Sequence, residues 1–440
     1  MGSDIALMTV GLLVLLIVFG FHIAIALAAC SVLGIYLMVG SWDAALAILE
    51  STAYEAIRKE VFAVIPLFVL MGDFVSRSGA AGDLYRACNR VLHFLPGRLA
   101  IATIAGNVVF GAVTGVSIAA AATFSRIAYP EMKKLGYRQS FSLGAIAGSA
   151  SLGMLIPPSV LMIVWSILTE MSVGALFMAG LVPGLILAGT FGLYVVVAAL
   201  RRPEIAPAGR DRGTLGDLPP PTTSERIGVL GVLGIVVLVI GGMWFGFFTP
   251  TEAAGFGTLF ALALALLKGL RGKQILEAII QSGRTTAPIM VLLISAQMYS
   301  RLLAFGGVVN AVQGTVLESG LGVVGILALM TIIWLILGAL IDSVSIILLT
   351  VPIFAPIAVA LGFDPLAFAI FGILIIEAGL LTPPFGLLVF TVKGCVADPS
   401  VTLRQIFAGA IPYTLAICFV GILVLLVPAL ASWLPKAMFG

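Results

Sequence analysis

Long apolar runs recur from one end of the chain to the other, separated by short polar or charged breaks. A hydrocarbon core about 30 Å thick needs about 20 apolar residues per helix, so runs of this length predict membrane-spanning helices. The strands of a transmembrane barrel would alternate polar and apolar residues instead. The predicted spans lie at residues 4–20, 23–40, 62–78, 140–170, 174–200, 227–248, 251–269, 285–304, 365–396 and 403–434.

Four further segments have a different pattern. Residues 99–129 and 321–358 are apolar stretches interrupted in the middle by small and polar residues, and we interpret each as a re-entrant helical hairpin that enters and leaves the membrane on one side. Residues 43–60 and 270–283 carry several charges directly before a span, which favours interfacial amphipathic helices.

The basic residues indicate the orientation. Lys and Arg prefer cytoplasmic loops. With the N-terminus outside, and with neither hairpin counted as a crossing, only four of the 23 basic residues stay outside: Arg58, Lys59, Arg301 and Lys436. Counting either hairpin as two crossings destroys this distribution. Both termini are therefore predicted to be periplasmic, in a bacterial inner membrane, and the Pro/Gly-rich linker at 201–226 is predicted to be cytoplasmic.

Composition adds one exclusion. Hydrophobic residues make up 61% of the 440 and charged residues 10%, whereas about a quarter of a soluble domain is charged. The surrounding partner is therefore expected to be the lipid bilayer and not nucleic acid. Four scattered cysteines and two distant histidines give no pattern for a transition metal.

The two halves of the chain share a pattern. Pro157-Pro158 recurs 226 residues later as Pro383-Pro384, and Val116-Ser117-Ile118 recurs 228 residues later as Val344-Ser345-Ile346. Each half, 1–200 and 227–440, contains five predicted spans and one hairpin. An odd number of crossings inverts the second copy. The predicted fold is thus an all-α polytopic membrane protein of two inverted-topology repeats, a design that places a binding site at the midplane.

The repeated proline pairs predict the chemistry. Proline has no N–H, so Pro157 and Pro158 should free the carbonyls of Gly153 and Met154, and the second pair those of Gly379 and Leu380. Bare carbonyls in hydrocarbon cost several kcal/mol each unless they meet a ligand, and a hard cation such as Na⁺ accepts such oxygens. Hydroxyl groups that could complete the shells belong to Thr114, Ser117, Ser343, Ser345 and Thr382.

An anionic solute fits the same region, because the half-helices that begin after each break offer free N–H groups and partial positive charge. Two acids lie there, and buried acids are usually functional. Asp342 either binds a cation or holds the second hairpin tip together. Glu377 is either a ligand or a structural acceptor for backbone N–H groups. Glu252, in Phe-Thr-Pro-Thr-Glu, is expected to cap the next helix.

At these motifs the chain resembles the large (M, or DctM-like) subunit of TRAP (tripartite ATP-independent periplasmic) transporters. The resemblance covers almost the whole chain, through motifs such as SLGMLIPPS, FFTPTEAA, GALIDSVSIILLTVPIFAPIA and GLLTPPFGLLVF. It implies an elevator-type mechanism in which a mobile domain with both hairpins slides against a scaffold. It also implies coupling to Na⁺ with no other cofactor, a small four-helix membrane subunit as partner, and a periplasmic substrate-binding protein.

The resemblance also assigns residues. By motif match the family's Na⁺ sites fall on Thr114, Gly115, Val116, Ser117, Gly153, Pro157, Asp342, Ser343, Ser345, Gly379 and Thr382. Substrate contacts are expected at Ser117, Ser151, Ser345 and Thr382. The first tip departs from the family's usual Ser-Gly-Ser-Ser run, because Val116 replaces a hydroxyl-bearing residue.

Two other functions are alternatives to a TRAP large subunit. A stand-alone Na⁺- or H⁺-coupled carboxylate symporter of related fold would need no binding protein. An intramembrane enzyme is not expected, because the chain has neither a metal-ligand pair on one helix nor a Ser/His dyad. The sequence does not distinguish among dicarboxylates, sialic acid, keto acids and other organic acids as substrates. It also does not determine the number of coupled ions or the oligomeric state.

Overall fold

The computed structural model describes residues 2–207, 220–307, 314 and 320–439, and every regular element of that part is helical. Most of the predicted linker, and part of the loop before the second hairpin, lie outside the described residues. The first half contains α1 (Gly2–Val18), α2 (Ile23–Val39), α3 (Trp42–Arg58), α4 (Val61–Arg77), α5 (Ala80–Val91), α6 (Arg98–Thr114), α7 (Ser117–Lys134), α8 (Gln139–Ala150), the 3₁₀ turn η1 (Ser151–Met154), α9 (Val160–Thr169) and α10 (Val173–Arg201).

The second half continues with α11 (Thr223–Val236), a π-helical turn η5 (Val237–Gly241), α12 (Gly242–Trp244), α13 (Pro250–Leu267), α14 (Gly272–Phe305), α16 (Gly322–Gly338), α17 (Ser343–Ala360), α18 (Pro365–Gly379), α19 (Leu387–Cys395), α20 (Leu403–Leu426) and α21 (Ala429–Phe439). A short 3₁₀ turn, η2 (Pro203–Ile205), follows α10.

Several of these helices can cross a membrane. Six are long and apolar enough, and α4 and α5 together form a seventh candidate that is bent by 67°. Large apolar side chains stand exposed on them, for example Leu267 and Leu426. A soluble monomer rarely exposes such continuous apolar surface, whereas lipid solvates it. The chain is therefore a multi-pass membrane protein.

Two predicted elements differ in the structure, and one helix has no predicted counterpart. Residues 270–283 are not a separate interfacial helix, because α14 runs unbroken through Gly283 and Pro288; a single Gly or Pro weakens a helix without having to end it. The span predicted at 403–434 ends at Leu426, because Pro428 forces Val427 out of helical geometry. The helix α5 was not predicted at all.

Charged residues explain why α5 was missed and what holds it. Asp83, Arg86 and Arg90 make its sequence look like a loop, but they pair with distant helices. Lys268 donates to Asp83 at 2.5 Å, and Glu225 accepts from Arg86 at 2.6 Å and from Arg90 at 2.9 Å. This network joins α5 to α11 and to the end of α13.

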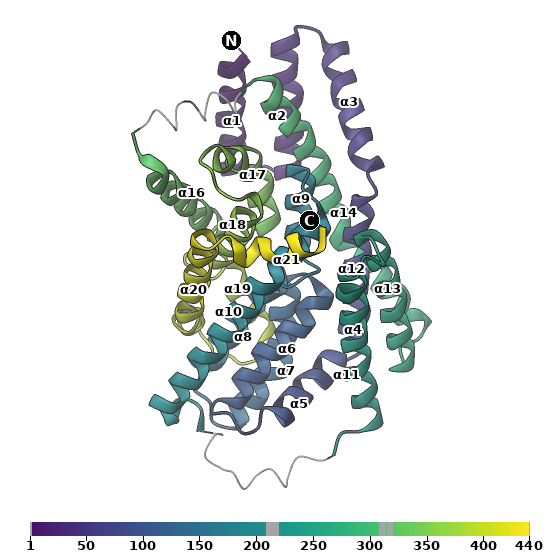
Figure 1. Cartoon of the computed structure of the whole chain (residues 1–440), viewed down its shortest axis with the longest axis vertical. Coiled ribbons are helices and arrows are strands. Elements are labelled where there is room, and N and C mark those ends of the chain that lie inside the picture. The colour runs from purple at the N-terminus through teal and green to yellow at the C-terminus, as the bar shows by residue number, and fades with distance from the viewer. Residues whose placement is uncertain (1, 208–219, 308–313, 315–319, 440) are drawn as a thin grey trace.

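Each predicted hairpin consists of two contacting helices joined by a short tip. The first is α6–α7, and the second is α16–α17. In Figure 1, α6 and α7 lie towards one end of the molecule and α16 and α17 towards the other, with α8, α18 and α19 between them. The two hairpins therefore flank a central region that contains α8, α18 and α19.

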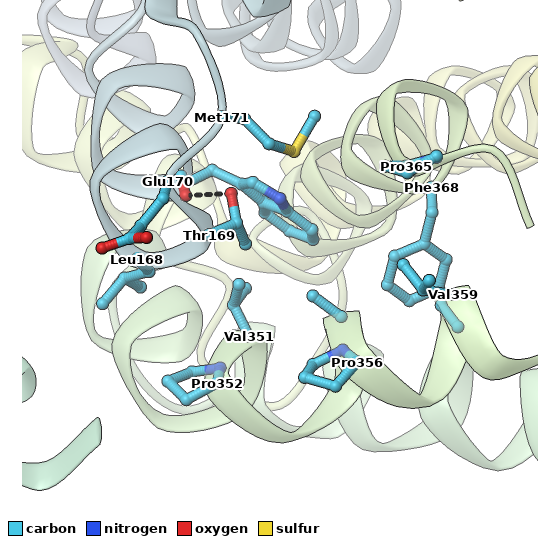
Figure 2. A pocket seen from close by; sticks show the side chains of 13 residues that line it. Leu168, Thr169, Glu170, Met171, Val351, Pro352, Pro356, Val359, Pro365 and Phe368 are labelled. Carbon is cyan, nitrogen blue, oxygen red and sulfur yellow. Dashed lines mark hydrogen bonds between the residues drawn. The ribbon is translucent and has the colours of Figure 1, made fainter. Parts of the chain in front are cut away.

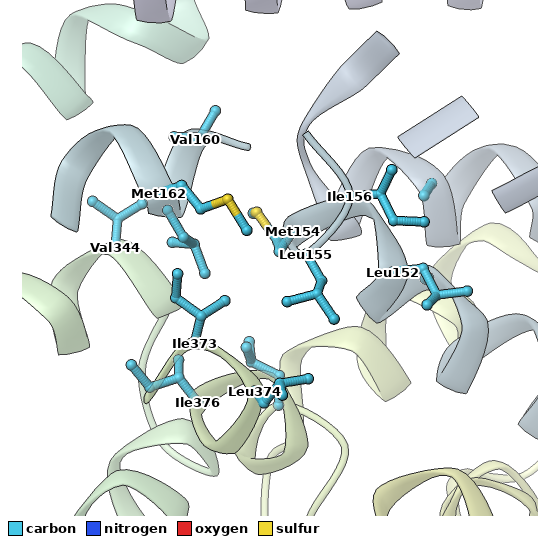
Figure 3. Close-up of a cluster of buried hydrophobic side chains, with 14 of the residues drawn as sticks. Leu152, Met154, Leu155, Ile156, Val160, Met162, Val344, Ile373, Leu374 and Ile376 are labelled. Carbon is cyan, nitrogen blue, oxygen red and sulfur yellow. The ribbon is translucent and has the colours of Figure 1, made fainter. Parts of the chain in front are cut away.

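The core there is shared by both halves. Figure 3 shows Met154, Leu155 and Ile156, from the first break, beside Ile373 and Leu374 of α18. An aromatic cluster continues this core: the ring centroids of Trp165 and Trp334 are 6.2 Å apart, and those of Trp334 and Phe368 are 5.5 Å apart. This packing sets the first proline-containing break against α18, the helix that leads into the second break.

Candidate functional site

The first break separates η1 from α9. Its Pro157–Pro158 peptide bond is cis. No described group donates a hydrogen bond to the carbonyl of Gly153, because the two prolines lack N–H groups and the N–H of Ile156 bonds to Leu152. The Met154 carbonyl, also predicted to be free, instead accepts from the Ser159 hydroxyl at 2.5 Å. One of the two predicted carbonyls is thus available.

The first hairpin tip rests directly on this break. Gly115 adopts a left-handed φ of +63°, and its carbonyl accepts from Val160 N at 3.2 Å. A Cβ on Gly115 would lie 2.6 Å from the Pro158 carbonyl oxygen, and one on Gly111 would lie 2.7 Å from Gly153 Cα. Only glycine permits so close an approach of two backbones.

All predicted first-half ligands meet at this contact. Thr114 ends α6, Val116 and Ser117 start α7, and a Cβ on Gly153 would be 3.5 Å from the Val116 carbonyl oxygen. Thr114 donates its hydroxyl proton to the Phe110 carbonyl, which leaves the lone pairs of its oxygen free. Ser151 lies in η1 and donates to Gly148.

The second tip rests on the second break in the same manner. A Cβ on Gly338 would lie 2.7 Å from Gly379 Cα, and Phe385 N donates to the Ala339 carbonyl at 3.2 Å. The Pro383–Pro384 bond is also cis. Both carbonyls predicted to be free are bonded here: Gly379 accepts from the N–H and hydroxyl of Thr382, and Leu380 accepts from Leu388 N.

Asp342 has the tip-holding role that was one of its two alternatives. Its Oδ1 accepts from Ser345 N at 3.0 Å and its Oδ2 from the Ser345 hydroxyl, so it caps α17. Ser343 is the first residue of that helix and is buried. The hydroxyl oxygens of Ser345 and Thr382, having donated their protons, keep lone pairs that a cation could use.

Glu377 lies near predicted ligands of both halves. It lies two positions before Gly379 and close to the side chain of Ser117. The residue Glu377 is 1% exposed, and neither of its carboxyl oxygens, nor the Ser117 hydroxyl, has a hydrogen-bond partner among the described residues. The interpretation of Glu377 as an acceptor for backbone N–H groups is therefore wrong.

The unpaired oxygens allow a fit test for Na⁺. Buried polar atoms are normally paired, and each exception requires an explanation. Around the first tip, the Gly153 carbonyl and the Ser117 hydroxyl lack partners among the described residues. Neutral oxygen donors of this kind suit a hard cation. The donor set therefore fits Na⁺.

The described cavities lie elsewhere. Figure 2 shows one of about 590 Å³ between the end of α9, α17 and the start of α18, lined by Trp165, Met171, Pro352 and Phe368 with Glu170 at its rim. Its lining is mainly apolar, and none of the predicted ligands contributes to it. The tips themselves are closely packed in this state of the molecule.

A sequence comparison identifies the family. Residues 10–430 match the DctM component of the tripartite ATP-independent periplasmic transporters. The chain belongs to the DctM family. It is thus the large permease subunit of a TRAP transporter, and a transporter rather than an enzyme.

Individual DctM relatives are clearly similar. The C4-dicarboxylate large permease DctM of Pseudomonas aeruginosa is 33% identical over 385 residues, which cover 87% of this chain and 88% of that protein. The ectoine large permease TeaC of Halomonas elongata is 29% identical over 430 residues, covering 96% and 97%. The sialic acid large permease SiaM of Vibrio cholerae is 27% identical over 382 residues, covering 86% of each.

Solved structures share the fold of this DctM chain. The YdaH transporter of Alcanivorax borkumensis aligns with a TM-score of 0.59 at 16% identity, over 89% of each chain. The efflux pump MtrF of Neisseria gonorrhoeae aligns with a TM-score of 0.58 at 16% identity, over 89% of this chain and 84% of that one.

One polar cluster of the DctM chain had no sequence signal. Asp398, in the loop after α19, accepts from the Tyr129 hydroxyl and from Lys133 Nζ, each at 2.7 Å, and Ser400 binds its other oxygen. The Lys133 ammonium, with the Tyr129 and Ser400 hydroxyls, holds the pKa of Asp398 well below its usual range. The partners are more than 260 residues apart in sequence, so no spacing rule could reveal them.

Proposed function

We propose that the chain imports an organic acid from the periplasm, driven by a Na⁺ gradient, through an elevator mechanism. The observation that carries this proposal is the pair of glycine contacts, Gly111 on Gly153 and Gly338 on Gly379. Each sets a hairpin tip on a proline break, and irregular backbone is tolerated in a membrane only where it is buried in protein or lines a cavity.

Two ion positions follow from this geometry. In the first half, Na⁺ would be held by oxygens of Thr114, Gly115, Val116, Ser117, Gly153 and the Pro157 turn, and in the second half by oxygens of Asp342, Ser343, Ser345, Gly379 and Thr382. The ion supplies the positive charge that attracts and couples the substrate. The chain supplies carbonyl and hydroxyl oxygens, the Asp342 carboxylate, and the glycines that let the backbones approach. Two inverted repeats, with hairpins that re-enter from opposite sides, would place both ions near the midplane.

The substrate is proposed to be a carboxylate. Relatives are named for C4-dicarboxylate, ectoine, sialic acid and isethionate. Their identities to this chain, 33% to 26%, are too similar to favour one of these substrates. A carboxylate would sit where half-helix N-termini and bound Na⁺ both favour negative charge. Ser117, Ser151, Ser345 and Thr382 are the proposed contacts.

Partners complete the assembly. The family description is tripartite, so we propose a small four-helix membrane subunit and a periplasmic binding protein that delivers the substrate. The stand-alone symporter is the alternative, and the fold shared with the YdaH transporter and the MtrF pump leaves it physically reasonable. Uptake by the chain alone in proteoliposomes would favour that alternative.

The decisive experiment compares Ser345→Ala with Thr391→Ala. Ser345 binds Asp342 at the second tip, whereas Thr391 is a half-buried threonine of α19 whose hydroxyl bonds to Leu387 of the same helix. In proteoliposomes that contain both partner subunits, Ser345→Ala is expected to reduce Na⁺-driven uptake of the transported acid at least tenfold, and Thr391→Ala to leave it unchanged. Equal uptake by both variants would contradict the assignment.

A further inference from the structure

A small polar cavity lies on the periplasmic side of the proposed topology, apart from the hairpin tips. It measures about 230 Å³ and lies between α3, the end of α9 and α14. Its polar lining comprises Glu55, Lys59, Glu170, Gln297, Ser300 and Arg301, with Thr52. None of the proposed Na⁺ or substrate ligands contributes to it, so it is a separate site.

The donors of this cavity are poorly satisfied. Arg301 forms no ion pair with any described residue. Among the described residues Lys59 pairs only with Glu170, at a long 3.7 Å, and the two side chains are 50% and 82% exposed. The Ser300 hydroxyl is buried without a partner among the described residues. Two cations, two carboxylates and one unpaired hydroxyl thus face one space, and Arg301 is the cation without an ion pair among the described residues.

The distribution of charge makes this convergence unusual. Under the proposed orientation only four of the 23 basic residues face the periplasm, and Lys59 and Arg301 are two of them. Lys and Arg are depleted on this side of the membrane, so two of them in one cavity lining is an uncommon arrangement. Gln297 helps to hold the site together by donating to the Ile167 carbonyl of α9 at 3.1 Å.

We propose that this cavity binds a small carboxylate between Arg301, Lys59 and Ser300, on its way from the periplasm to the hairpin tips. The direction and the substrate class rest on the proposed function. A guanidinium group binds a carboxylate in bidentate fashion. The volume lies below the 300–1,000 Å³ of typical drug-sized sites, which suits an acid of a few carbon atoms. Glu170 competes for Lys59 and is displaced by the arriving anion, and Glu55 keeps the empty cavity close to neutral.

A thiol probe tests this site without transport. Ala304 is exposed and lines the cavity, so Ala304→Cys reports on it. The rate of modification by anionic 2-sulfonatoethyl methanethiosulfonate is divided by the rate with the cationic trimethylammonioethyl reagent, after subtraction of the four native cysteines. We expect this ratio to fall about fivefold with Arg301→Gln or Lys59→Gln, because a unit charge a few ångströms away is removed. Succinate is expected to protect the thiol in the parent but not in Arg301→Gln.

Two further variants sharpen the result. Glu170→Gln removes the competing acid and is expected to raise the ratio, whereas a merely structural Lys59–Glu170 pair would give no such opposite effect. Lys436→Gln removes a basic residue of the same predicted face outside the cavity and is expected to leave the ratio of the two modification rates unchanged.

The proposal is overturned if Arg301→Gln and Lys59→Gln leave this ratio unchanged, or if succinate does not protect the thiol. Leu168→Cys, at a half-buried lining position that makes none of the proposed contacts, serves as the reporter if Ala304→Cys does not reach the membrane. Labelling needs neither Na⁺ nor partner subunits, so its failure leaves the uptake experiment to judge the transport proposal.

Discussion

Glycine occupies the places where hairpin tips meet the proline breaks. Gly111, Gly153, Gly338 and Gly379 approach other backbones so closely that a methyl group at three of them would fall within 2.7 Å of a backbone carbon. Gly115 combines such contact with a left-handed φ of +63°. These glycines belong to the repeated motifs of the two halves, but only the structure shows which backbone atoms each one contacts.

Gly115→Ala tests the tip contact at this scale. The left-handed conformation costs an alanine roughly 1–2 kcal/mol, and the Pro158 oxygen 2.6 Å away adds a clash. We expect the free energy of unfolding to fall by more than in Gly20→Ala, whose φ of +82° imposes the same strain with nothing within 4 Å. Thermal unfolding in detergent measures both; equal losses would mean that the tip does not press on the break.

At the scale of elements, apolar length predicted where helices lie, because lipid leaves few other solutions for a spanning backbone. Pattern alone did not show where helices merge or stop. α14 absorbed a predicted amphipathic segment, and Pro428 shortened the last span. α5 was missed because its charges are satisfied by α11 and α13, more than 130 residues later. Such long-range pairs have no local sequence signal.

The Asp398 cluster ties the first hairpin to the loop after α19, and its contribution depends on pH. A carboxyl group whose pKa is depressed by folding stabilises the protein above its unfolded pKa of about 3.9, and this stabilisation is lost as the pH falls towards the folded pKa. Asp398→Asn is therefore expected to lower the melting temperature at pH 6, by a difference that shrinks below about pH 4.

The matched control for this cluster is Glu131→Gln. Glu131 lies on α7, the helix that carries Tyr129 and Lys133, and its exposed carboxyl group forms no ion pair among the described residues. It should leave the melting temperature nearly unchanged at pH 6. A difference between Asp398→Asn and the parent that stays constant from pH 6 to pH 3 would show that the cluster does not act through ionisation of Asp398.

For the whole molecule, the account depends on orientation. Helix positions and family membership were predictable from the sequence, whereas the sidedness rests on the distribution of Lys and Arg. Thr223, at the start of α11, is placed in the cytoplasm by this rule, and Asp43, at the start of α3, in the periplasm. The Ser117–Glu377 approach links the two halves irrespective of orientation.

Single cysteines at these positions test the topology. Thr223→Cys is expected to react with a membrane-impermeant maleimide only in inverted vesicles, and Asp43→Cys only in intact spheroplasts. Both positions are exposed, so accessibility to the reagent is not limited by packing. Labelling of Thr223→Cys in spheroplasts would reverse the orientation, and with it the direction of import.

The central claim is that the hairpin tips and proline breaks hold Na⁺. Its most direct test is the melting temperature of the purified chain as Na⁺ replaces K⁺ at constant ionic strength. A ligand that binds only the folded state at 100 times its dissociation constant adds about 2.7 kcal/mol. We predict a rise with Na⁺ that is reduced in Thr382→Val and unchanged in Thr391→Val. Equal melting temperatures in Na⁺ and K⁺, or a full Na⁺ effect in Thr382→Val, would contradict the account.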